Sequence, residues 1–248
     1  MKKVRGIFVL LVCLVLVSLA CSVSLDLEGG GTVRGSGNVV SEERSISGVK
    51  RVNLTNQGDL IIEIGDEEKL VIEAEDNLQE YLVADMRGGE LVLSTKNFTN
   101  LRPTEPIRYL LTVKQLEGLQ VTSSGDIRAP ELRADDFKVK VSSSGEINIE
   151  ALYTDSLEVD ISSSGDVIIE DGEAQDQDIS ISSSGSYKAE QVMSRTARVR
   201  ISSSGSARIW VTDELDVNIS SSGNVYYRGD PHADVRKSSS GDAIKSGD

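Results

Sequence analysis

The sequence predicts an all-β fold, a right-handed parallel β-solenoid (β-helix) with coils of about 20 residues. Three observations favour it. The tetrapeptide Ser-Ser-Ser-Gly, with Thr-Ser-Ser-Gly as its first copy, recurs once in each such unit, and the last units are slightly shorter. β-branched residues alternate with polar residues before each copy, and a second, shorter alternating run follows it. The glycines that mark the copies are Gly125, Gly145, Gly165, Gly185, Gly205, Gly223 and Gly241.

The run before each glycine is typical of a half-buried strand. Val159 and Ile161, for example, alternate with the polar residues Glu158 and Asp160, and this period of two places the apolar side chains on one face. A short strand cannot bury that face alone, whereas stacked coils align such residues in continuous columns. A right-handed crossover is the default for parallel strands.

The glycines are expected to form the corners of the coils. Glycine adopts a positive φ without a steric cost. The serines are small enough to stack there, and their hydroxyls can bond backbone groups or one another. Stacking would also place Lys138 over Glu158 and Lys140 over Asp160, which are favourable cross-strand pairs.

Residues 1–20 predict a signal peptide. Lys2, Lys3 and Arg5 precede an apolar run, Ile7–Ala20, that is too short for a membrane-spanning helix. Export of the protein is therefore expected.

Cys21 is the predicted lipidation site. The sequence "VSLAC" is similar to a bacterial lipobox at Ala20 and Cys21 but departs from it at Ser18 and Leu19, so acylation stays open. Cys13 lies within the signal peptide, which leaves Cys21 without a partner for an intrachain disulfide. We expect a lipoprotein held at the cell membrane or cell surface.

The mature chain divides into a tether and one domain. Residues 21–47 are rich in glycine and predict a flexible, lipid-anchored tether, with an irregular first strand as an alternative. Residues 48–248 predict a single β-solenoid domain. Its regular coils begin at about residue 119, and a less regular β part with a turn at Gln57–Gly58 precedes them.

Composition excludes several classes of protein. The net charge is −14, and removal of the basic signal peptide makes the chain more negative still, which disfavours nucleic acid and anionic lipid surfaces as partners. Aromatic residues make up only 4% of the chain, so platforms for sugar rings are scarce. Rossmann, P-loop and zinc-binding patterns are absent from the sequence.

No catalytic residues are expected. A serine hydrolase needs a base beside one chosen serine, whereas His232 is the only histidine and is expected to be a solvated loop residue. Asp126, Glu146 and Asp166 follow successive glycines and would stack, which makes them weak candidates for Ca²⁺. Solvated corner acids are the alternative, and no other cofactor is expected. Trp210, Tyr226 and Tyr227 are expected to cap the core.

Longer runs carry a family resemblance. "VKRVNLTNQGDLIIEIGDEEKLVIEAEDNL", "GGELVLSTK" and "IRYLLTVKQLEGLQVTSSGDIRA", followed by repeated SSSG turns, resemble the family of putative auto-transporter adhesins with a head GIN domain, over about Ile46 to Tyr227. The resemblance implies an exported or lipid-anchored bacterial β-solenoid protein with a structural or binding role, and it brings no catalytic residues.

The sequence therefore predicts a cell-envelope lipoprotein with a non-catalytic, adhesin-like binding or structural role. Its partners would be the membrane, through the anchor, and a polysaccharide or envelope protein. The alternative is a solenoid enzyme acting on envelope polysaccharide, in which Glu158 and Asp160 would lie beside Lys138 and Lys140. A sensor or assembly role for another envelope protein is a third possibility.

Overall fold

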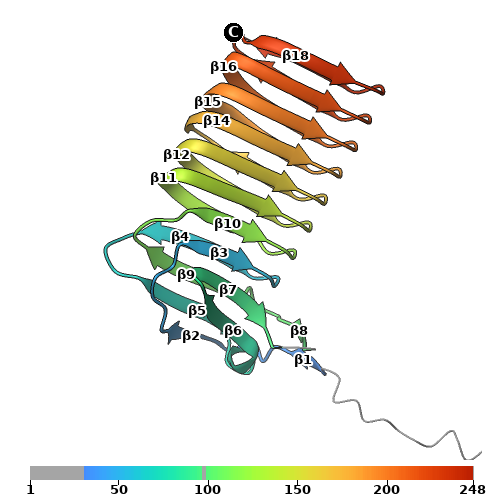
Figure 1. Cartoon of the computed structure of the whole chain (residues 1–248). Helices are drawn as coiled ribbons and strands as arrows, with labels where there is room; N and C mark the ends of the chain where they lie inside the picture. The colour runs from blue at the N-terminus through green and yellow to red at the C-terminus, as the bar shows by residue number, and fades with distance from the viewer. Residues whose placement is uncertain (1–30, 97–98, 248) are drawn as a thin grey trace, which may run out of the picture.

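The computed structural model describes residues 31–96 and 99–247. The predicted signal peptide and Cys21 lie outside these residues. The described chain consists of strands, turns and one short 3-10 helix, and its sheets continue from coil to coil (Figure 1). Within this part of the chain, no helix is long and apolar enough to span a membrane. The expected all-β parallel solenoid is confirmed.

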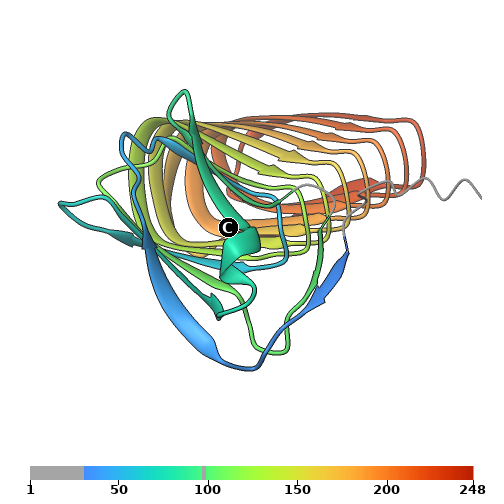
Figure 2. The same ribbon diagram turned by 90° about the horizontal axis from the view of Figure 1, so that it is seen from below.

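The regular array contains ten strands. Strands of successive coils pair in parallel and in register, as Val139 does with Val159 and, in the shorter last coils, Val217 with Val235. Seen along the stack, the coils lie over one another (Figure 2). The strands are β10 (Gly118–Val121), β11 (Ile127–Val141), β12 (Glu146–Ile161), β13 (Asp166–Ile169), β14 (Gly172–Ile181), β15 (Ser186–Ile201), β16 (Ser206–Ile219), β17 (Asn224–Arg228), β18 (His232–Lys237) and β19 (Asp242–Gly247).

Apolar columns fill the interior of the array. Ile161, Ile181 and Ile201 are neighbours in one column, and each is 1% exposed. Tyr187 is the largest side chain in a second column, and its hydroxyl donates a hydrogen bond of 2.8 Å to Oε1 of Gln177 across the core. Ala207 lies beside Tyr187 in the ladder, and its small side chain leaves room for the ring. The columns provide the hydrophobic free energy that holds the coils together.

The corner glycines have a different role from the one expected. None of the glycines of the Ser-Ser-Ser-Gly repeats has a positive φ. A Cβ added at Gly165 would instead lie closer than 3.0 Å to the carbonyl oxygen of Gly145 in the coil below, and the later corners repeat this contact. Glycine is needed because the coils approach so closely. The backbone N–H of Gly185 donates to the carbonyl of Ser163 at 3.0 Å, which joins neighbouring corners.

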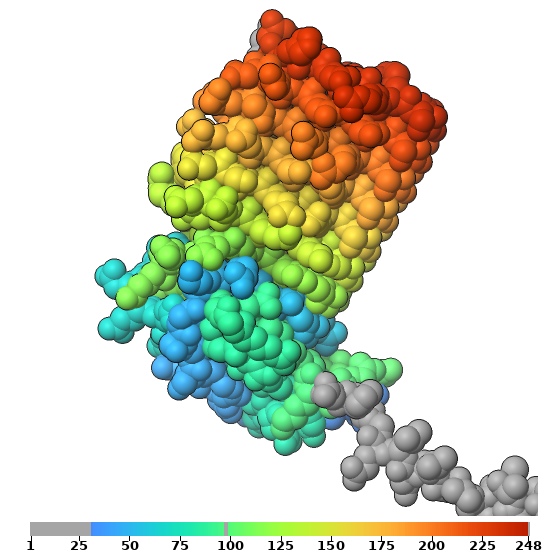
Figure 3. All heavy atoms as spheres, in the orientation of Figure 1, coloured from blue at the N-terminus to red at the C-terminus, as the bar shows by residue number. Residues whose placement is uncertain are grey.

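The N-terminal part contains nine strands and the 3-10 helix η1 (Gln79–Tyr81). It packs against the base of the array as one continuous body (Figure 3). The strands are β1 (Thr32–Arg34), β2 (Val39–Arg44), β3 (Arg51–Leu54), β4 (Asp59–Ile64), β5 (Lys69–Glu75), β6 (Leu82–Arg87), β7 (Glu90–Thr95), β8 (Asn100–Arg102) and β9 (Arg108–Val113).

The first coils are stacked out of sequence order. β3 lies between β7 and β10, and β4 lies between β9 and β11, all in parallel. The turn at Gln57–Gly58 is therefore the corner directly below Gly125, and the Ser123 hydroxyl donates to the carbonyl of Asn56. The antiparallel strands β5 and β2 continue from β9 and close this end of the stack.

The described end of the expected tether is structured. Two strands lie there, since β1 (Thr32–Arg34) pairs with β8 and β2 (Val39–Arg44) pairs with β5. Glu75 fastens the connecting loop, because its buried carboxylate accepts hydrogen bonds from the backbone of Gly37 at 2.6 Å and Thr104 at 2.9 Å. Burial raises the pKa of Glu75, but the hydrogen bonds from the Thr104 hydroxyl and from the backbone of Thr104 and Gly37 outweigh burial and hold the pKa below its usual value.

Candidate functional site

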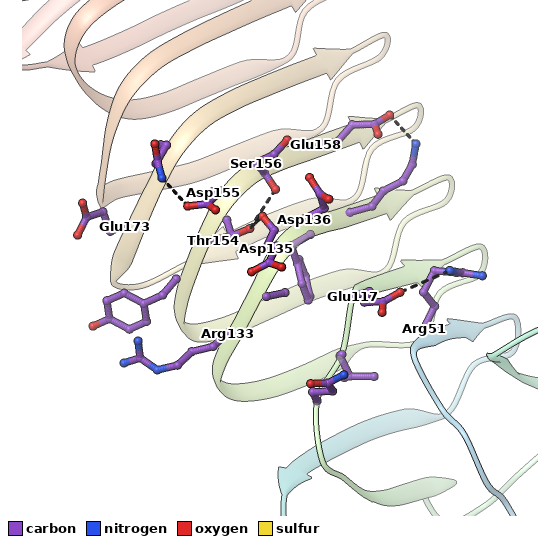
Figure 4. A pocket seen from close by; sticks show the side chains of 17 residues that line it. Arg51, Glu117, Arg133, Asp135, Asp136, Thr154, Asp155, Ser156, Glu158 and Glu173 are labelled. Carbon is purple, nitrogen blue, oxygen red and sulfur yellow. Dashed lines mark hydrogen bonds and ion pairs between the residues drawn. The ribbon is translucent and has the colours of Figure 1, made fainter.

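A groove of about 1060 Å³ lies where the regular array meets the N-terminal part. Seventeen side chains line it in Figure 4. They come from β3, which contributes Arg51, from the connection before β10 and from three successive long strands, β11, β12 and β14, mostly at their bends. The regularity of the array fixes these bends, because each lies directly above the one before it.

The groove forms where one strand lacks a neighbour. β11 pairs with β12 along most of its length, but on its other edge only Ile127–Arg128 pair with β4 and only Lys138–Val141 pair with β10. Among the described strands, none pairs with the lower edge of residues 129–137. The side of the coil formed by these residues therefore begins with β11, and space remains below it.

The walls of the groove are mainly acidic. At each bend two successive residues point outward, Asp135 and Asp136 in β11 and Asp155 and Ser156 in β12. Three cationic side chains balance part of this charge. The lining carboxylates are Glu117, Asp135, Asp136, Asp155, Glu158 and Glu173, and the cations are Arg51, Arg133 and Lys138.

Ion pairs hold the walls in place. Lys138 lies 2.5 Å from Glu158 and 3.6 Å from Asp160. The hydrogen bond to Glu158 raises the pKa of Lys138 above its usual value. This confirms the expected stacking of Lys138 over Glu158. Lys140 is in register with Asp160, but Asp160 pairs with Lys138 instead.

The inner surface of the groove contains apolar and aromatic groups. Phe137 and Leu116 are almost fully buried at 2% and 1% exposure. The Thr154 hydroxyl donates to the carbonyl of Asp135 at 2.9 Å, which ties the bends of β11 and β12 together. The guanidinium of Arg133 lies 4.1 Å from the ring centre of Tyr153, so a cation already covers one face of this ring.

The three candidate metal ligands lie at successive corners, and two of them, Asp126 and Asp166, accept protein hydrogen bonds. Asp126 accepts from the backbone N–H of Glu146 at 2.9 Å. Asp166 accepts from Ser186 and lies 3.1 Å from Nζ of Lys188. Burial raises the pKa of Asp166, but the bonds to Ser186 and Lys188 outweigh burial and lower it. In the described part of the chain, no group of three His, Cys, Asp or Glu side chains is arranged to hold a metal ion.

The other residues singled out in the sequence lie away from the groove. His232 is exposed at the start of β18. Tyr227 packs against the core as expected. Trp210 and Tyr226 instead lie on the outer surface, where each ring contacts an arginine, at 4.7 Å from Arg228 and 5.1 Å from Arg208 respectively. The expectation that all three aromatic residues cap the core is therefore wrong for these two.

Sequence reasoning missed the groove, although a signal for it exists. Asp135-Asp136 and Asp155-Ser156 interrupt the alternation of apolar and polar residues at the same point of two successive units. Such paired polar residues mark a bend at which both side chains face outward. The missing strand below β11 has no comparable local signal, because it depends on the out-of-order stacking of β3 and β4.

Solved structures share this fold. A crystal structure of a putative lipid binding protein from Parabacteroides distasonis is 24% identical, with a TM-score of 0.71 over 87% of this chain and all of that chain. A putative adhesin from Bacteroides fragilis is 19% identical, with a TM-score of 0.78 over 86% of this chain and 99% of that one. A putative adhesin from Parabacteroides merdae is 22% identical, with a TM-score of 0.67 over the same shares.

Comparison with curated proteins gave no significant match. A family model matches residues 50–231, which include the groove and all but the last coil of the array. The expected resemblance is thereby confirmed, and the chain belongs to the family of putative auto-transporter adhesins with a head GIN domain.

Proposed function

We propose that this protein is an exported, lipid-anchored binding module of the cell envelope that has no catalytic activity and contacts its ligand through the groove. Family membership supports a non-catalytic binding role. The signal peptide and Cys21 in the sequence support export and anchoring.

The single observation that carries the assignment of the site is the convergence of charged, polar and aromatic side chains in one groove. They belong to strands that are paired in register above the groove. A ligand would meet a surface that needs little reordering, and a preorganised surface reduces the entropic cost of binding. The rest of the array serves as a rigid support for the strands that line the groove.

The anchor is tested by a Cys21→Ser substitution. Loss of the acylated thiol should move the protein from the membrane fraction to the soluble exported fraction, because the acyl chains supply the membrane affinity. Retention of the Cys21→Ser protein in membranes would show that lipidation at this residue does not hold it there.

The groove is tested with the released, full-length Cys21→Ser protein. We measure its binding to immobilised envelope polysaccharides and envelope proteins. The Tyr153→Ala substitution should weaken this binding about tenfold, which corresponds to a loss of about 1.4 kcal/mol of binding free energy, because it removes an aromatic side chain from the interface. Tyr226→Ala is the matched control, since Tyr226 also lies against an arginine but outside the groove. Equal losses in both variants would place the ligand elsewhere.

The second candidate function is cleavage of an envelope polysaccharide. It is favoured by the six carboxylates in the groove, since glycoside hydrolysis uses a pair of such groups. We expect no release of reducing sugar from envelope polysaccharide by the wild-type protein. If the wild-type protein releases reducing sugar and the Asp155→Asn variant does not, cleavage of polysaccharide is the function.

A further inference from the structure

We propose that the groove accepts an extended, positively charged polypeptide segment, which adds as a strand to the free edge of β11 at residues 131–136. This inference rests on the proposed function and names the class of partner for the same groove.

The open backbone edge is the first argument. Residues 131–136 of β11 pair upward with β12, and among the described strands none pairs with them from below. Alternate residues of a parallel strand bond to opposite neighbours, so about half of the amide groups in this segment point toward the groove without a strand partner. A polypeptide main chain offers the matching series of donors and acceptors, and addition of a strand to a free edge is a common mode of peptide recognition.

The ends of the free edge set its length. Pro130 has no N–H to donate and forms one limit. At the other limit the backbone N–H of Lys138 donates to the carbonyl of Glu117 at 3.1 Å. Residues 131–136, which lie between these limits, span about 20 Å at roughly 3.3 Å per residue, the length of an ordinary strand.

Charge identifies the kind of segment. Glu158 and Glu117 are balanced by ion pairs with Lys138 and Lys50, but Asp135, Asp136 and Glu173 have no cationic partner among the described side chains. These excess carboxylates favour a segment that carries Lys or Arg. Residues 21–30 of this chain contain Asp26 and Glu28 and no basic residue, so the same charges disfavour the protein's own tether as occupant.

The aromatic groups favour a peptide over a sugar chain. A sugar ring would need an open aromatic face, whereas Arg133 lies over the ring of Tyr153. Phe137 is almost fully buried. The groove thus offers backbone groups and carboxylates rather than a stacking platform.

The test uses the full-length Cys21→Ser protein and an eight-residue peptide of alternating lysine and threonine. This peptide should bind, and the same peptide with glutamate in place of lysine should not. Two further peptides carry backbone N-methyl groups, one on every lysine and the other on every threonine. Because only alternate amides of an added strand face β11, one methylated peptide should lose binding about tenfold or more while the other retains it.

A pair of variants separates the groove from general charge. Asp136 and Glu214 occupy the same outward column, four coils apart, and both are exposed. Asp136→Asn should weaken binding of the lysine–threonine peptide about threefold, as expected for one exposed charge, whereas Glu214→Gln should leave it unchanged.

Two results would overturn the inference. Equal binding of both methylated peptides would mean electrostatic adsorption without strand pairing. If the peptide does not bind, and Tyr153→Ala abolishes binding of a polysaccharide, then a polypeptide is not the ligand of the groove but the proposed function still holds. If neither Tyr153→Ala nor Asp136→Asn changes the binding of any ligand, the proposed function fails as well.

Discussion

In the regular array, paired residues such as Val139 and Val159 belong to consecutive repeats. In the N-terminal part, by contrast, Arg51 of β3 pairs with Gly118 of β10, although six other strands lie between β3 and β10 in the sequence. Both regions build the same corner, since Gly58 lies below Gly125 as Gly125 lies below Gly145. They differ in the order in which the chain visits the coils. The array is thus a repeat whose neighbours in sequence are neighbours in space, and the N-terminal part is not.

This difference has a functional consequence at the boundary. A strictly repetitive solenoid covers every strand edge except those at its two ends. Here β4, inserted out of sequence order, lies below one end of β11 and β10 lies below the other end, but the middle of β11 has no lower neighbour among the described strands. The groove exists because two different ways of building a coil meet there.

The largest expected effect compares glycines in the two regions. Gly165→Ala should cost about 3 kcal/mol of unfolding free energy, because the new methyl group meets the backbone oxygen of Gly145, which cannot move without separating the coils. Gly65→Ala should cost less than about 1 kcal/mol, because its methyl group meets only Cγ2 of Thr112 at 2.7 Å, a side chain that can shift.

Urea unfolding measures both variants, and Ser164→Ala, an exposed corner residue, is the control for the array. Equal costs for the two glycine variants would show that close backbone stacking does not distinguish the array.

Glu75→Gln probes the N-terminal part alone. We expect a loss of about 2 kcal/mol at pH 7, since the carboxylate is buried and accepts hydrogen bonds from Gly37 and Thr104. The folded-state pKa of Glu75 lies below its usual value. The contribution is therefore present above the usual glutamate pKa and is lost as the pH falls through the folded-state value.

The unfolding free energies of wild type and Glu75→Gln should therefore converge as the solution is acidified. A difference that grows at low pH would contradict this assignment.

Tyr187→Phe tests a polar contact inside the array. It should cost about 1 kcal/mol, because Oε1 of Gln177 loses its buried donor. Nε2 of Gln177 already lacks a hydrogen-bond partner among the described residues. The double variant Tyr187→Phe/Gln177→Leu should therefore be as stable as wild type or more stable, and a double-mutant cycle measures the coupling. Additive losses would show that the two side chains do not interact.

The smallest effect is expected at the surface. Lys138→Ala in the array removes the exposed ion pairs with Glu158 and Asp160, and Lys50→Ala in the N-terminal part removes the exposed pair with Glu117. Each should cost less than about 0.5 kcal/mol, as measured by the midpoint of urea unfolding. A cost above about 1 kcal/mol at either lysine would mean that surface pairing contributes to holding the coils in register.

The two regions also differ in how far the sequence predicts them. Alternation around Val159 and Ile161 predicts β12, its register and its buried face, because the repeat places the same residue types at the same height in each coil. The stacking of Gly58 below Gly125 was not predictable, since nothing in "TNQG" indicates which later corner lies above it. The positive φ expected of the corner glycines was wrong, because a backbone approach between coils leaves no local mark in the sequence.

The candidate site likewise has one part that the sequence predicts and another that it does not. Its carboxylates at Asp135 and Asp155 are visible in the sequence as polar pairs at equivalent points of the repeat. Their grouping into a groove depends on the missing lower neighbour of β11, which is a property of the tertiary topology. Prediction from the sequence therefore reaches the side chains of the site but not the open edge.

Amide hydrogen exchange of the free protein tests the open edge most directly. Residues 131–136 of β11 and residues 151–156 of β12 occupy equivalent positions in neighbouring coils, and only the β12 segment has a strand on both sides. Every second amide of residues 131–136 faces the unpaired edge and should exchange as fast as the amides of exposed loops. The amides of residues 151–156 face a neighbouring strand on either side and should exchange slowly. Equal protection of the two segments would contradict the free edge and, with it, the account of the groove.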